Sequence, residues 1–468
     1  MIMEYNLLKE EWIPVLWNDG RTGKVGIIEA LVNAHRIRQI AASNPMDRVA
    51  ILRFLLAILY WCRGNPPEDE EDISGEPFPE NWFSKVEDQK DCFNLLGDGK
   101  RFYQDRTASR KRTVTELLQE IPTGNNFWHF RHSTDEMDGL CPSCCAMGLL
   151  RLPLFSVSGL PDLKAGINGT PPVYVVPYSR TLSNTLRLNW LKYEELGDPI
   201  WIRTNIHTSP NISVPLLTGL TLLSRRVLLH NPSAPPGSCV GCGSKTEFLI
   251  RKCEYQTAGE QKNDNWDDPH VVYGDRIPRS AIKAPDPTTA GRFRMDRKWT
   301  DLITSMIVTG KYKNEREGTF FLVVGFATDK AKNIDVWERT VFMPKSLFVP
   351  EKTTSLIQQW QKKGGQLEKD KWISRAERER SAIVAAIRPH VEKNVSDNIG
   401  ELLIGDEESW KKASDEYRPM MEIVAKSLSP GFTAAAVERR RRIAGVKPEM
   451  GTKVKLEKKS GRKKGGSK

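Results

Sequence analysis

Two pairs of cysteines have the spacing of ligands to a single metal ion. Two residues separate Cys141 from Cys144, and two separate Cys239 from Cys242. This spacing lets a tight turn direct both sulfurs at one tetrahedral zinc ion. The pairs stand 94 residues apart, far beyond the interval of a zinc finger, so they must meet through the tertiary fold. We therefore expect a structural zinc site of four cysteines.

The sequence leaves some freedom in this assignment. Gly241 and Gly243 relieve the backbone where the second turn is sharpest. Cys145 competes as a ligand in the first motif, and Cys253 is either a core residue or a spare ligand. Redox chemistry is the other use of such motifs, but neither is expected at the strand-to-helix junction of a thioredoxin-like site. Four cysteine ligands leave zinc no open position for catalysis.

The residue types of a catalytic centre are not grouped in this sequence. The seven histidines are scattered, and only His129 and His132 are near each other. No phosphate-binding GxxxxGK[ST] loop, no His-Asp metal doublet and no GxSxG nucleophile turn occurs. We expect a protein that binds rather than catalyses. A metal-dependent nuclease is the enzymatic alternative, and it would cut DNA unaided with magnesium or manganese.

Three segments offer groups that contact nucleic acids. Residues 127–132 combine aromatic rings with histidines and an arginine, which can stack on unpaired bases and hold phosphate. Arg251 and Lys252 follow the second cysteine pair, where a bound zinc would fix their positions. Lys330 and Lys332 lie in a polar segment between two expected strands. Each has a structural alternative: the aromatic rings pack into the core, and the charged side chains are simply solvated.

The elements that position these groups begin with short strands. Residues 12–15 and 25–28 predict two strands around a turn at residues 18–20. Residues 46–62 predict a buried helix, with Ser43 or Asn44 as its N-cap and Pro45 in the first helical position.

Two stretches further along the chain predict more strands. Residues 173–178 predict a strand and residues 181–191 a helix. Residues 320–326 and 337–343 predict two strands joined by the polar loop 327–335, which gives a hairpin with a basic tip.

The character of the chain changes near residues 350–370, where strand signals give way to helix formers. We expect an α+β fold: a mixed α/β domain with the zinc site over residues 1–360, then an antiparallel four-helix bundle over residues 361–450. Residues 451–468 form a basic tail that carries +7 of the formal net charge of +11. Such a tail binds polyanions through counterion release or serves only for solubility.

The N-terminus does not predict a secretory signal. The longest apolar run, residues 54–62, is far shorter than the ~20 residues that a membrane span needs. A cytoplasmic location follows, and cysteines in a reducing compartment are core residues or metal ligands rather than disulfides.

Taken together, these segments resemble the CasA family, the large subunit of the type I-E CRISPR surveillance complex, Cascade. The resemblance spans about residues 1–345 and depends on an ordered set of blocks. These are residues 5–8, residues 12–15, residues 93–104, the first cysteine pair through Gly148 and Gly166 to Thr170 and Pro171, the second cysteine pair, and the strand pair at 320–343.

The resemblance implies a non-catalytic role in antiviral defence. Guide RNA pairing reads the target sequence in such complexes, while protein reads a short motif beside it. A CasA-like subunit recognises this protospacer-adjacent motif in double-stranded DNA, mainly from the minor groove. It aids duplex opening and recruits a separate helicase-nuclease, and its partners are guide RNA and the other Cascade subunits. The alternative is an unrelated zinc-stabilised RNA-binding ribonucleoprotein scaffold.

The resemblance also implies roles for particular positions. The loop that contacts guide RNA falls on Phe130, Arg131 and His132. The DNA-contacting positions comprise a glycine loop, a lysine finger and a wedge, which fall on Ser158, Gly159, Leu160 and Pro161, on Lys252, and on Asp329, Lys330 and Ala331. The sequence departs from the family at two of these: the glycine run is reduced to one glycine, and lysine replaces the glutamine of the wedge.

Overall fold

The structure, a computed structural model, describes a mixed α/β fold that carries all eight cysteines. The described residues are 4–67, 76–119, 138–157, 164, 166–169, 171–203, 213–233, 235–259, 261, 263, 265–271, 318–329 and 332–344. They all belong to the first of two compact units, Met1–Ser355. The predicted helical bundle at 361–450 and the basic tail at 451–468 lie outside the described residues, so both stay predictions.

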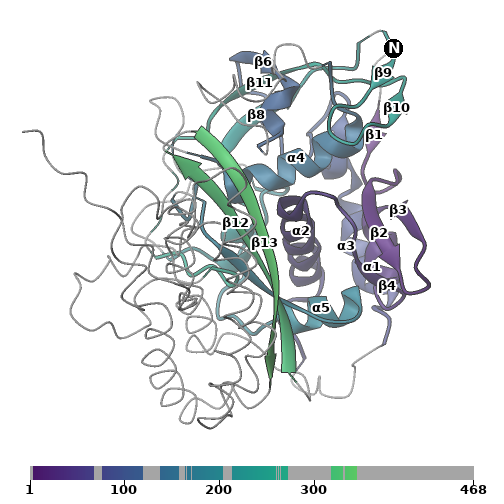
Figure 1. Ribbon diagram of the computed structural model, residues 1–468, viewed down its shortest axis with the longest axis vertical. Helices are drawn as coiled ribbons and strands as arrows, with labels where there is room; N and C mark the ends of the chain where they lie inside the picture. Colours follow the sequence, from purple (N-terminus) through teal and green to yellow (C-terminus); the bar gives the residue numbers. More distant parts are fainter. Residues whose placement is uncertain are drawn as a thin grey trace, which may run out of the picture. The chain divides into compact units, whose positions relative to one another are not determined.

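Helix α2, Pro45–Arg63, lies at the centre of the described fold. Figure 1 shows it between the β12–β13 hairpin and the sheet that contains β2. The Asn44 side chain accepts a hydrogen bond from the backbone N–H of Met46 at 2.9 Å, and Pro45 occupies the first turn, where its missing donor costs nothing. The helix ends at Gly64, whose φ of 78° suits glycine. The predicted buried helix is therefore confirmed.

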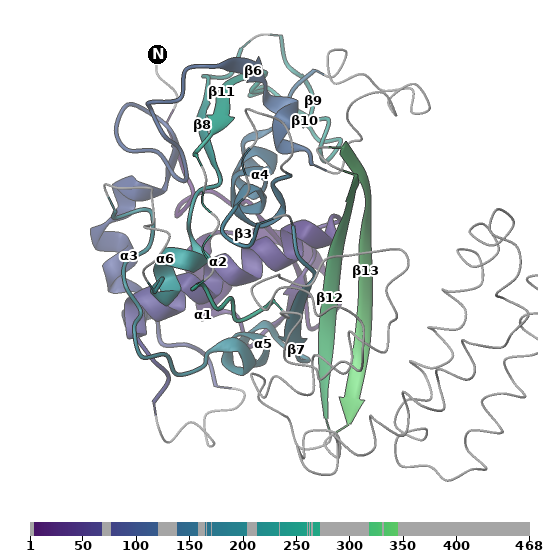
Figure 2. The same cartoon turned by 90° about the vertical axis from the view of Figure 1, so that its left-hand side faces the viewer.

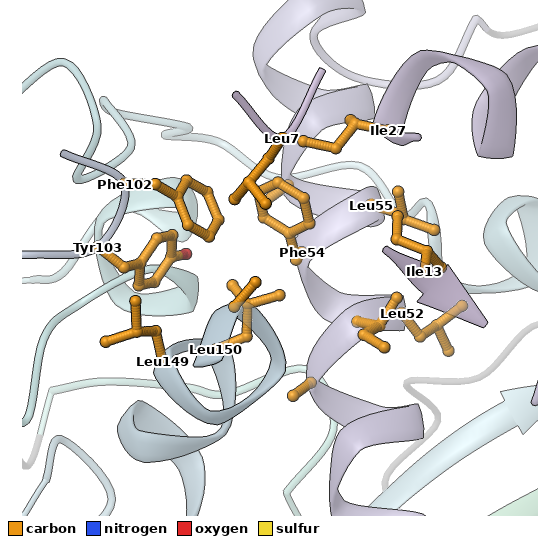
Figure 3. Close-up of a cluster of buried hydrophobic side chains, with 14 of the residues drawn as sticks. Leu7, Ile13, Ile27, Leu52, Phe54, Leu55, Phe102, Tyr103, Leu149 and Leu150 are labelled. Atoms are coloured by element: carbon orange, nitrogen blue, oxygen red, sulfur yellow. The ribbon is translucent and has the colours of Figure 1, made fainter. Parts of the chain in front are cut away.

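Aromatic rings pack around α2 at Phe54. The Phe54 ring meets Phe102 and Trp201 edge to face, with ring centroids 5.3 Å and 5.8 Å apart. Pairs of this geometry stabilise a core by about 0.5–1.5 kcal/mol beyond the burial of their surface. Figure 3 shows Leu55, on the next position of the helix, directed towards Ile13 of the N-terminal sheet. The helix thus packs on more than one side, as its apolar run predicts.

Helix α4, Pro142–Phe155, packs against α2. A buried ion pair joins the two helices, with Arg151 Nε 3.0 Å from Asp47 Oδ1. Both side chains are less than a tenth exposed. Because neither charge reaches bulk water, each helix depends on the other to neutralise it.

The N-terminal sheet has the strand order β3-β2-β4. Strand β2 covers Ile13–Trp17, β3 covers Thr22–Val25 and β4 covers Ile37–Ile40, and both outer strands pair antiparallel with β2. The predicted turn before β3 is confirmed, with Gly20 at a φ of 89°.

The predicted strand at 25–28 is partly wrong, because helix α1, Ile27–Val32, begins inside it. Gly26 is its N-cap residue, and the backbone N–H of Ala30 donates to the Gly26 carbonyl at 3.0 Å. Ile27, Ala30 and Leu31 are all buried. Their spacing of three and four residues is helical, and it outweighs the strand preference of two consecutive isoleucines.

A second sheet has the order β13-β12-β7. Strand β7 covers Tyr174–Tyr178, β12 covers Gly318–Asp329 and β13 covers Lys332–Pro344. The predicted hairpin is confirmed, but most of its predicted loop at 327–335 is strand. Backbone pairing continues to Asp329 and Lys332, with a register shift after Ala327. A two-stranded ribbon needs no apolar face to keep its backbone hydrogen bonds, so polar residues did not end it.

Helix α5, Leu182–Asn189, follows β7. The Thr181 side chain caps it by accepting a hydrogen bond from the backbone N–H of Asn184 at 3.2 Å. The predicted strand and helix in this region are both confirmed.

A third sheet has the order β6-β11-β8. Its strands are Lys111–Thr113, Lys252–Thr257 and Arg225–Leu229, and all pairs are antiparallel. Strands β9, Gly237–Ser238, and β10, Lys245–Thr246, form a short ribbon. Figures 1 and 2 both place this ribbon at the same end of the described fold as the sheet.

The remaining elements are short. They are β1 at Tyr5–Asn6, η2 at Glu80–Phe83, α3 at Ser84–Asp88, η3 at Lys90–Phe93, β5 at Asn94–Leu96, η4 at Val114–Leu117 and α6 at Leu216–Leu220. Strands β1 and β5 pair antiparallel. None of the helices found in the described ranges combines the length and the apolar character that crossing a bilayer requires.

A buried polar network ties α2 to the segment 265–271. Arg53 binds both carboxylate oxygens of Asp268, at 2.6 Å and 2.9 Å. The same guanidinium lies 2.8 Å from Nδ1 of His270, whose Nε2 lies 2.9 Å from Oδ1 of Asn189. Arginine can only donate, so Nδ1 accepts and Nε2 carries the proton of a neutral imidazole. Asn168 donates a further hydrogen bond to the Asp268 carboxylate at 2.9 Å.

The charge of Asp268 is stabilised inside the fold. Burial acts to raise the pKa of this carboxyl, but the facing Arg53 guanidinium and its hydrogen bonds outweigh burial and lower the pKa to about 2. The ordinary value is about 3.9. The folded state therefore binds this proton more weakly than the unfolded state does. The resulting stability is complete above about pH 4 and is lost as the pH falls through about 2.

The Asp268→Asn variant should lose about 3–5 kcal/mol of unfolding free energy at pH 7, because it removes the carboxylate that faces the buried Arg53 guanidinium. Urea denaturation would measure this loss. Asp267→Asn, at the exposed neighbouring residue, is the matched control and should cost at most about 1 kcal/mol. The difference between the wild type and Asp268→Asn should shrink from pH 4 towards pH 2, and a difference independent of pH in that range would contradict this assignment.

Candidate metal centre and nucleic-acid interface

The first cysteine pair opens helix α4. Cys141 is the N-cap residue and Pro142 follows in the first turn. Cys144 lies three residues further on, one helical turn away, so both side chains lie on the same side of the helix start. The tight turn that the spacing predicts is therefore the first turn of a helix. Proline at the first helical position starts the helix inside the motif, because its fixed φ suits that position.

The second cysteine pair lies in the connection between β9 and β10. The backbone N–H of Gly243 donates to the Cys239 carbonyl at 2.8 Å, which closes the turn, and Gly243 has a φ of 73°. A side chain at Gly241 would bring its Cβ within 3.1 Å of the Cys144 sulfur. The predicted backbone role is confirmed for Gly243, whose positive φ permits the turn. Gly241 has a role that was not predicted, because it permits the close approach of the Cys144 sulfur.

The fold brings the four predicted cysteines into one group. Their sulfurs all lie within 4.8 Å of one another, and Cys141, Cys144 and Cys239 are buried while Cys242 is exposed. The sulfurs of Cys141 and Cys242 are 3.8 Å apart. The backbone N–H of Cys141 also donates to the Cys239 sulfur at 3.2 Å. The two motifs thus meet through the tertiary fold, as predicted, and the group could hold a metal ion.

Backbone pairing holds the two motifs together. The backbone N–H of Val240 donates to the Gly139 carbonyl at 3.0 Å. Leu140 and Ile250 exchange two hydrogen bonds of 2.9 Å. The segment before the first motif is therefore paired with both the second motif and the approach to β11, so the positions of the sulfurs do not depend on their side chains alone.

The electrostatics of the group favour a bound cation. Hydrogen bonds from the Cys141 and Cys144 thiols lower the pKa of Cys239. Hydrogen bonding with Cys141 and, to a smaller extent, with Cys239 strongly raises the pKa of Cys144. One thiolate is thus stabilised by protons that its neighbours keep. All four sulfurs can be ionised together only when a positive charge lies between them, which is the chemistry of a thiolate metal site.

The two competing cysteines lie outside the group. Cys145 is fully buried, and it is the next residue round the helix from Cys144. Cys253 is fully buried in β11, and its thiol donates to the Thr113 carbonyl at 3.5 Å. All eight cysteines of the chain are free of disulfides. Cys253 is therefore a core residue.

Among the positions to which the family resemblance assigns nucleic-acid contacts, Lys252 is the one whose side chain the structure describes. It is the first residue of β11, and it is exposed while the adjacent Cys253 is buried. Its side chain therefore lies on the outer face of the β6-β11-β8 sheet. Asp329 is the last residue of β12. The other predicted contacts lie outside the described residues, and they are Phe130, Arg131, His132, Ser158, Gly159, Leu160, Pro161, Lys330 and Ala331.

Arg251 has a structural role that the sequence did not reveal. Its Nε and Nη2 bind Oδ1 and Oδ2 of Asp138 at 2.5 Å and 3.0 Å. The same Nη2 donates to the Pro235 carbonyl at 2.7 Å. Arg251 therefore links the start of β11 to two other segments. Asp138 lies just before the first cysteine motif, and Pro235 lies just before the second. A basic residue beside a loop indicates a ligand contact as readily as an internal ion pair, so no sequence signal separated the two.

Known proteins resemble this chain in sequence and in fold. The profile of the family described as CRISPR-associated protein Cse1 (CRISPR_cse1) matches residues 6–370. The CRISPR-associated protein CasA/Cse1 of Thermus thermophilus is 32% identical over 212 residues. This match covers 42% of each chain, which is less than half the length of that relative.

Solved structures show the same fold over nearly the whole chain. Thermus thermophilus CasA (Cse1) has a TM-score of 0.68 at 20% identity, covering 95% of this chain and 99% of that one. Cse1 from Acidimicrobium ferrooxidans has a TM-score of 0.63 at 17% identity, covering 95% and 98%. A chain of a CRISPR RNA-guided surveillance complex has a TM-score of 0.64 at 15% identity, covering 94% and 99%. These likenesses show the fold.

The Gly241→Ala variant should weaken metal binding about tenfold. Its new Cβ would lie 3.1 Å from the Cys144 sulfur, and relieving a contact of that kind costs about 1–3 kcal/mol. Competition with a chelator, followed by the thiolate absorption of bound cobalt, would measure the affinity. Gly99→Ala is the control, because a Cβ there meets no atom within 4 Å. Equal affinities in the two variants would show that the close packing at Gly241 does not matter.

Proposed function

This chain belongs to the CRISPR-associated protein Cse1 family, and from that premise we propose that it is the large subunit of a type I-E Cascade complex. In that role it recognises the protospacer-adjacent motif in double-stranded target DNA, aids opening of the duplex and recruits a helicase-nuclease. It performs no chemistry itself and acts in the cytoplasm in antiviral defence. The observation that carries the proposal is the family match over residues 6–370.

The proposed partners are a guide RNA and the other subunits of the complex. A likeness to one chain of a CRISPR RNA-guided surveillance complex, over 94% of this chain, supports an assembly of that kind. Base pairing with the guide reads the target in such a complex, so the protein needs to read only the adjacent motif. A surface assembled from several loops suffices for that task, and a catalytic centre is not required.

We propose zinc as the ion held by Cys141, Cys144, Cys239 and Cys242. Four thiolates are the ligand set of a structural zinc site, and zinc accepts the tetrahedral arrangement without a preference of its own. The buried position of three of the sulfurs and the N–H donor to Cys239 suit such a site. Bound zinc supplies a cross-link between two segments that are far apart in the sequence, and it supplies no reactive position.

The proposed metal centre lies close in the sequence to two groups of proposed contacts. The proposed RNA contacts, Phe130, Arg131 and His132, lie nine to eleven residues before Cys141. Lys252 follows the second motif by ten residues, and the pairing of Leu140 with Ile250 joins the two regions. A bound zinc ion would therefore fix the position of the proposed RNA-contacting loop relative to the proposed DNA-contacting Lys252. Reading of a motif requires contacts in fixed positions.

The proposed DNA contacts come from three places in the chain. Ser158, Gly159, Leu160 and Pro161 approach the minor groove, Lys252 reaches the DNA from β11, and Asp329, Lys330 and Ala331 act as a wedge at the end of the β12–β13 hairpin. A lysine in the wedge can donate hydrogen bonds but cannot accept them. The minor groove presents acceptors at every base pair, so a donor in this position suits tolerance of several motifs.

Cys141→Ser should reduce the zinc content and lower the free energy of unfolding by about 3–5 kcal/mol, because the metal contributes directly to folding. Metal analysis and thermal denaturation would measure these effects. A chelator should destabilise the wild type but not the variant. Cys62→Ser is the matched control, since Cys62 is half-buried and outside the sulfur group. Full zinc content in Cys141→Ser would refute the four-cysteine assignment.

The double variant Lys252→Ala, Lys330→Ala should weaken binding of target duplex by about tenfold or more in the complex assembled with guide RNA. The dependence of affinity on salt should become shallower by about one unit for each lysine that neutralises a phosphate. Lys24→Ala, an exposed lysine on β3, is the control, and zinc content should stay unchanged throughout. Unchanged affinity would remove both lysines from the site. RNA binding without any motif-dependent DNA binding would favour a ribonucleoprotein scaffold instead.

A further inference from the structure

The β6-β11-β8 sheet has one buried face and one outer face. Its inner face packs against α4 and η4. The residues that point inward from β8 and β11 are buried, and they are Arg225, Val227, Leu229, Cys253 and Tyr255. The residues between them point outward and are exposed or half-buried. Figures 1 and 2 show the three strands at one end of the described fold. The outer face can therefore be reached by a partner.

The pairing register places one cation in each of three successive rows across this outer face. Lys252 of β11 is in the first row. Lys111 of β6 pairs with Glu254, two residues further along β11. Arg226 of β8 pairs with Gln256, two residues further again. Successive rows lie about 7 Å apart, which is about two base-pair steps along one strand of a duplex.

The carboxylate on the same face does not neutralise these cations. Oε1 of Glu254 lies 3.0 Å from Nε2 of His230, and the Glu254 side chain is only 13% exposed. Lys111 and Lys252 are both exposed, and neither forms an ion pair with another described residue. Arg226 donates to a hydroxyl and a backbone carbonyl, which are both uncharged. The outer face therefore presents more positive charge than negative charge to the solvent.

A charged residue on an edge strand has a simpler explanation, because it discourages pairing with a second sheet. That explanation fits Lys111, since β6 is an edge strand, but Lys252 lies on the central strand. It does not fit Arg226 either, because the edge of β8 is already covered: the backbone N–H of Asp105 donates to the Val227 carbonyl at 2.8 Å. The three cations thus have a face in common rather than an edge, and such a face fits a polyanion.

The composition of the outer face favours the backbone of a duplex over other polyanions. Protein interfaces are depleted of lysine and enriched in aromatic residues. Single-stranded nucleic acids are bound largely by aromatic rings that stack on bases. The outward residues of β6, β8 and β11 include no aromatic ring. Lysine and arginine side chains that hold phosphates without stacking on bases are typical of duplex binding.

We propose that Lys111 and Arg226 bind phosphates of the target duplex beside Lys252, so that the outer face of the β6-β11-β8 sheet binds the duplex backbone. The inference rests on the proposed function, which supplies the duplex and assigns Lys252 to it. Phosphate contacts fix the position of a duplex but carry no sequence information. These two residues therefore strengthen the binding of every duplex, and discrimination between motifs comes from other contacts.

The test is Lys111→Gln in the full chain, assembled with guide RNA and the other subunits. Glutamine keeps a long polar side chain and removes the charge. The affinities for duplexes with and without the motif should both fall about fivefold, so their ratio stays constant. The dependence of each affinity on salt should become shallower by about one unit, and adding Arg226→Gln should make it shallower by about one unit more.

Lys24→Gln is the matched control. Lys24 is also an exposed lysine on an edge strand of a three-stranded antiparallel sheet, and the substitution removes the same charge. It should leave both affinities and both salt dependences unchanged. Lys111→Arg should keep the wild-type values, because arginine also binds phosphate. Zinc content and the free energy of unfolding should stay constant in all three single variants.

The outcomes separate this inference from the proposed function. Equal affinities and salt dependences in Lys111→Gln and Lys24→Gln would overturn the inference and leave Lys111 as protection for an edge strand. A loss limited to the motif-containing duplex would also overturn it, because it would indicate base reading. Loss of guide RNA with unchanged duplex affinity would assign the face to RNA instead. A wild-type complex that binds duplexes without any motif preference would overturn the proposed function alone.

Discussion

Four sulfur atoms from two distant motifs meet within 4.8 Å of one another, and the arrangement of the surrounding loops depends on that meeting. Without a cation the group cannot ionise fully, as the opposite shifts in the pKa of Cys144 and Cys239 indicate. With a metal ion it becomes a cross-link between the start of α4 and the β9–β10 turn. Such a link is strong and short, and it involves no flexible side chain longer than cysteine.

Two arginines extend this constraint from the metal centre to the loops. Arg251 fastens Asp138 to the segment before the second motif, next to Lys252. Beyond the other end of α4, the buried Arg225 donates to the carbonyls of Val157 and Lys164. Helix α4 therefore has the cysteine group at its start and Arg225 beyond its end, while its buried ion pair with α2 fixes it to the core.

Sequence reasoning found what local chemistry determines. The capped start of α2, the two cysteine pairs and the β12–β13 hairpin each have a signal within a few residues. The helix at Ile27 was missed because burial of its helical face outweighed strand preference. The hairpin was predicted too short because backbone pairing continues through polar residues. The buried roles of Arg225 and Arg251 had no local signal, because arginine is usually exposed and its acceptors here are backbone carbonyls and a carboxylate from distant segments.

X-ray absorption at the zinc edge of the purified wild-type chain would test the central claim most directly. We predict one zinc ion per chain with four sulfur neighbours at about 2.3 Å and no nitrogen or oxygen ligand. A chain purified without metal, or an ion with fewer sulfur neighbours, would contradict the cross-link and with it the frame that positions the loops.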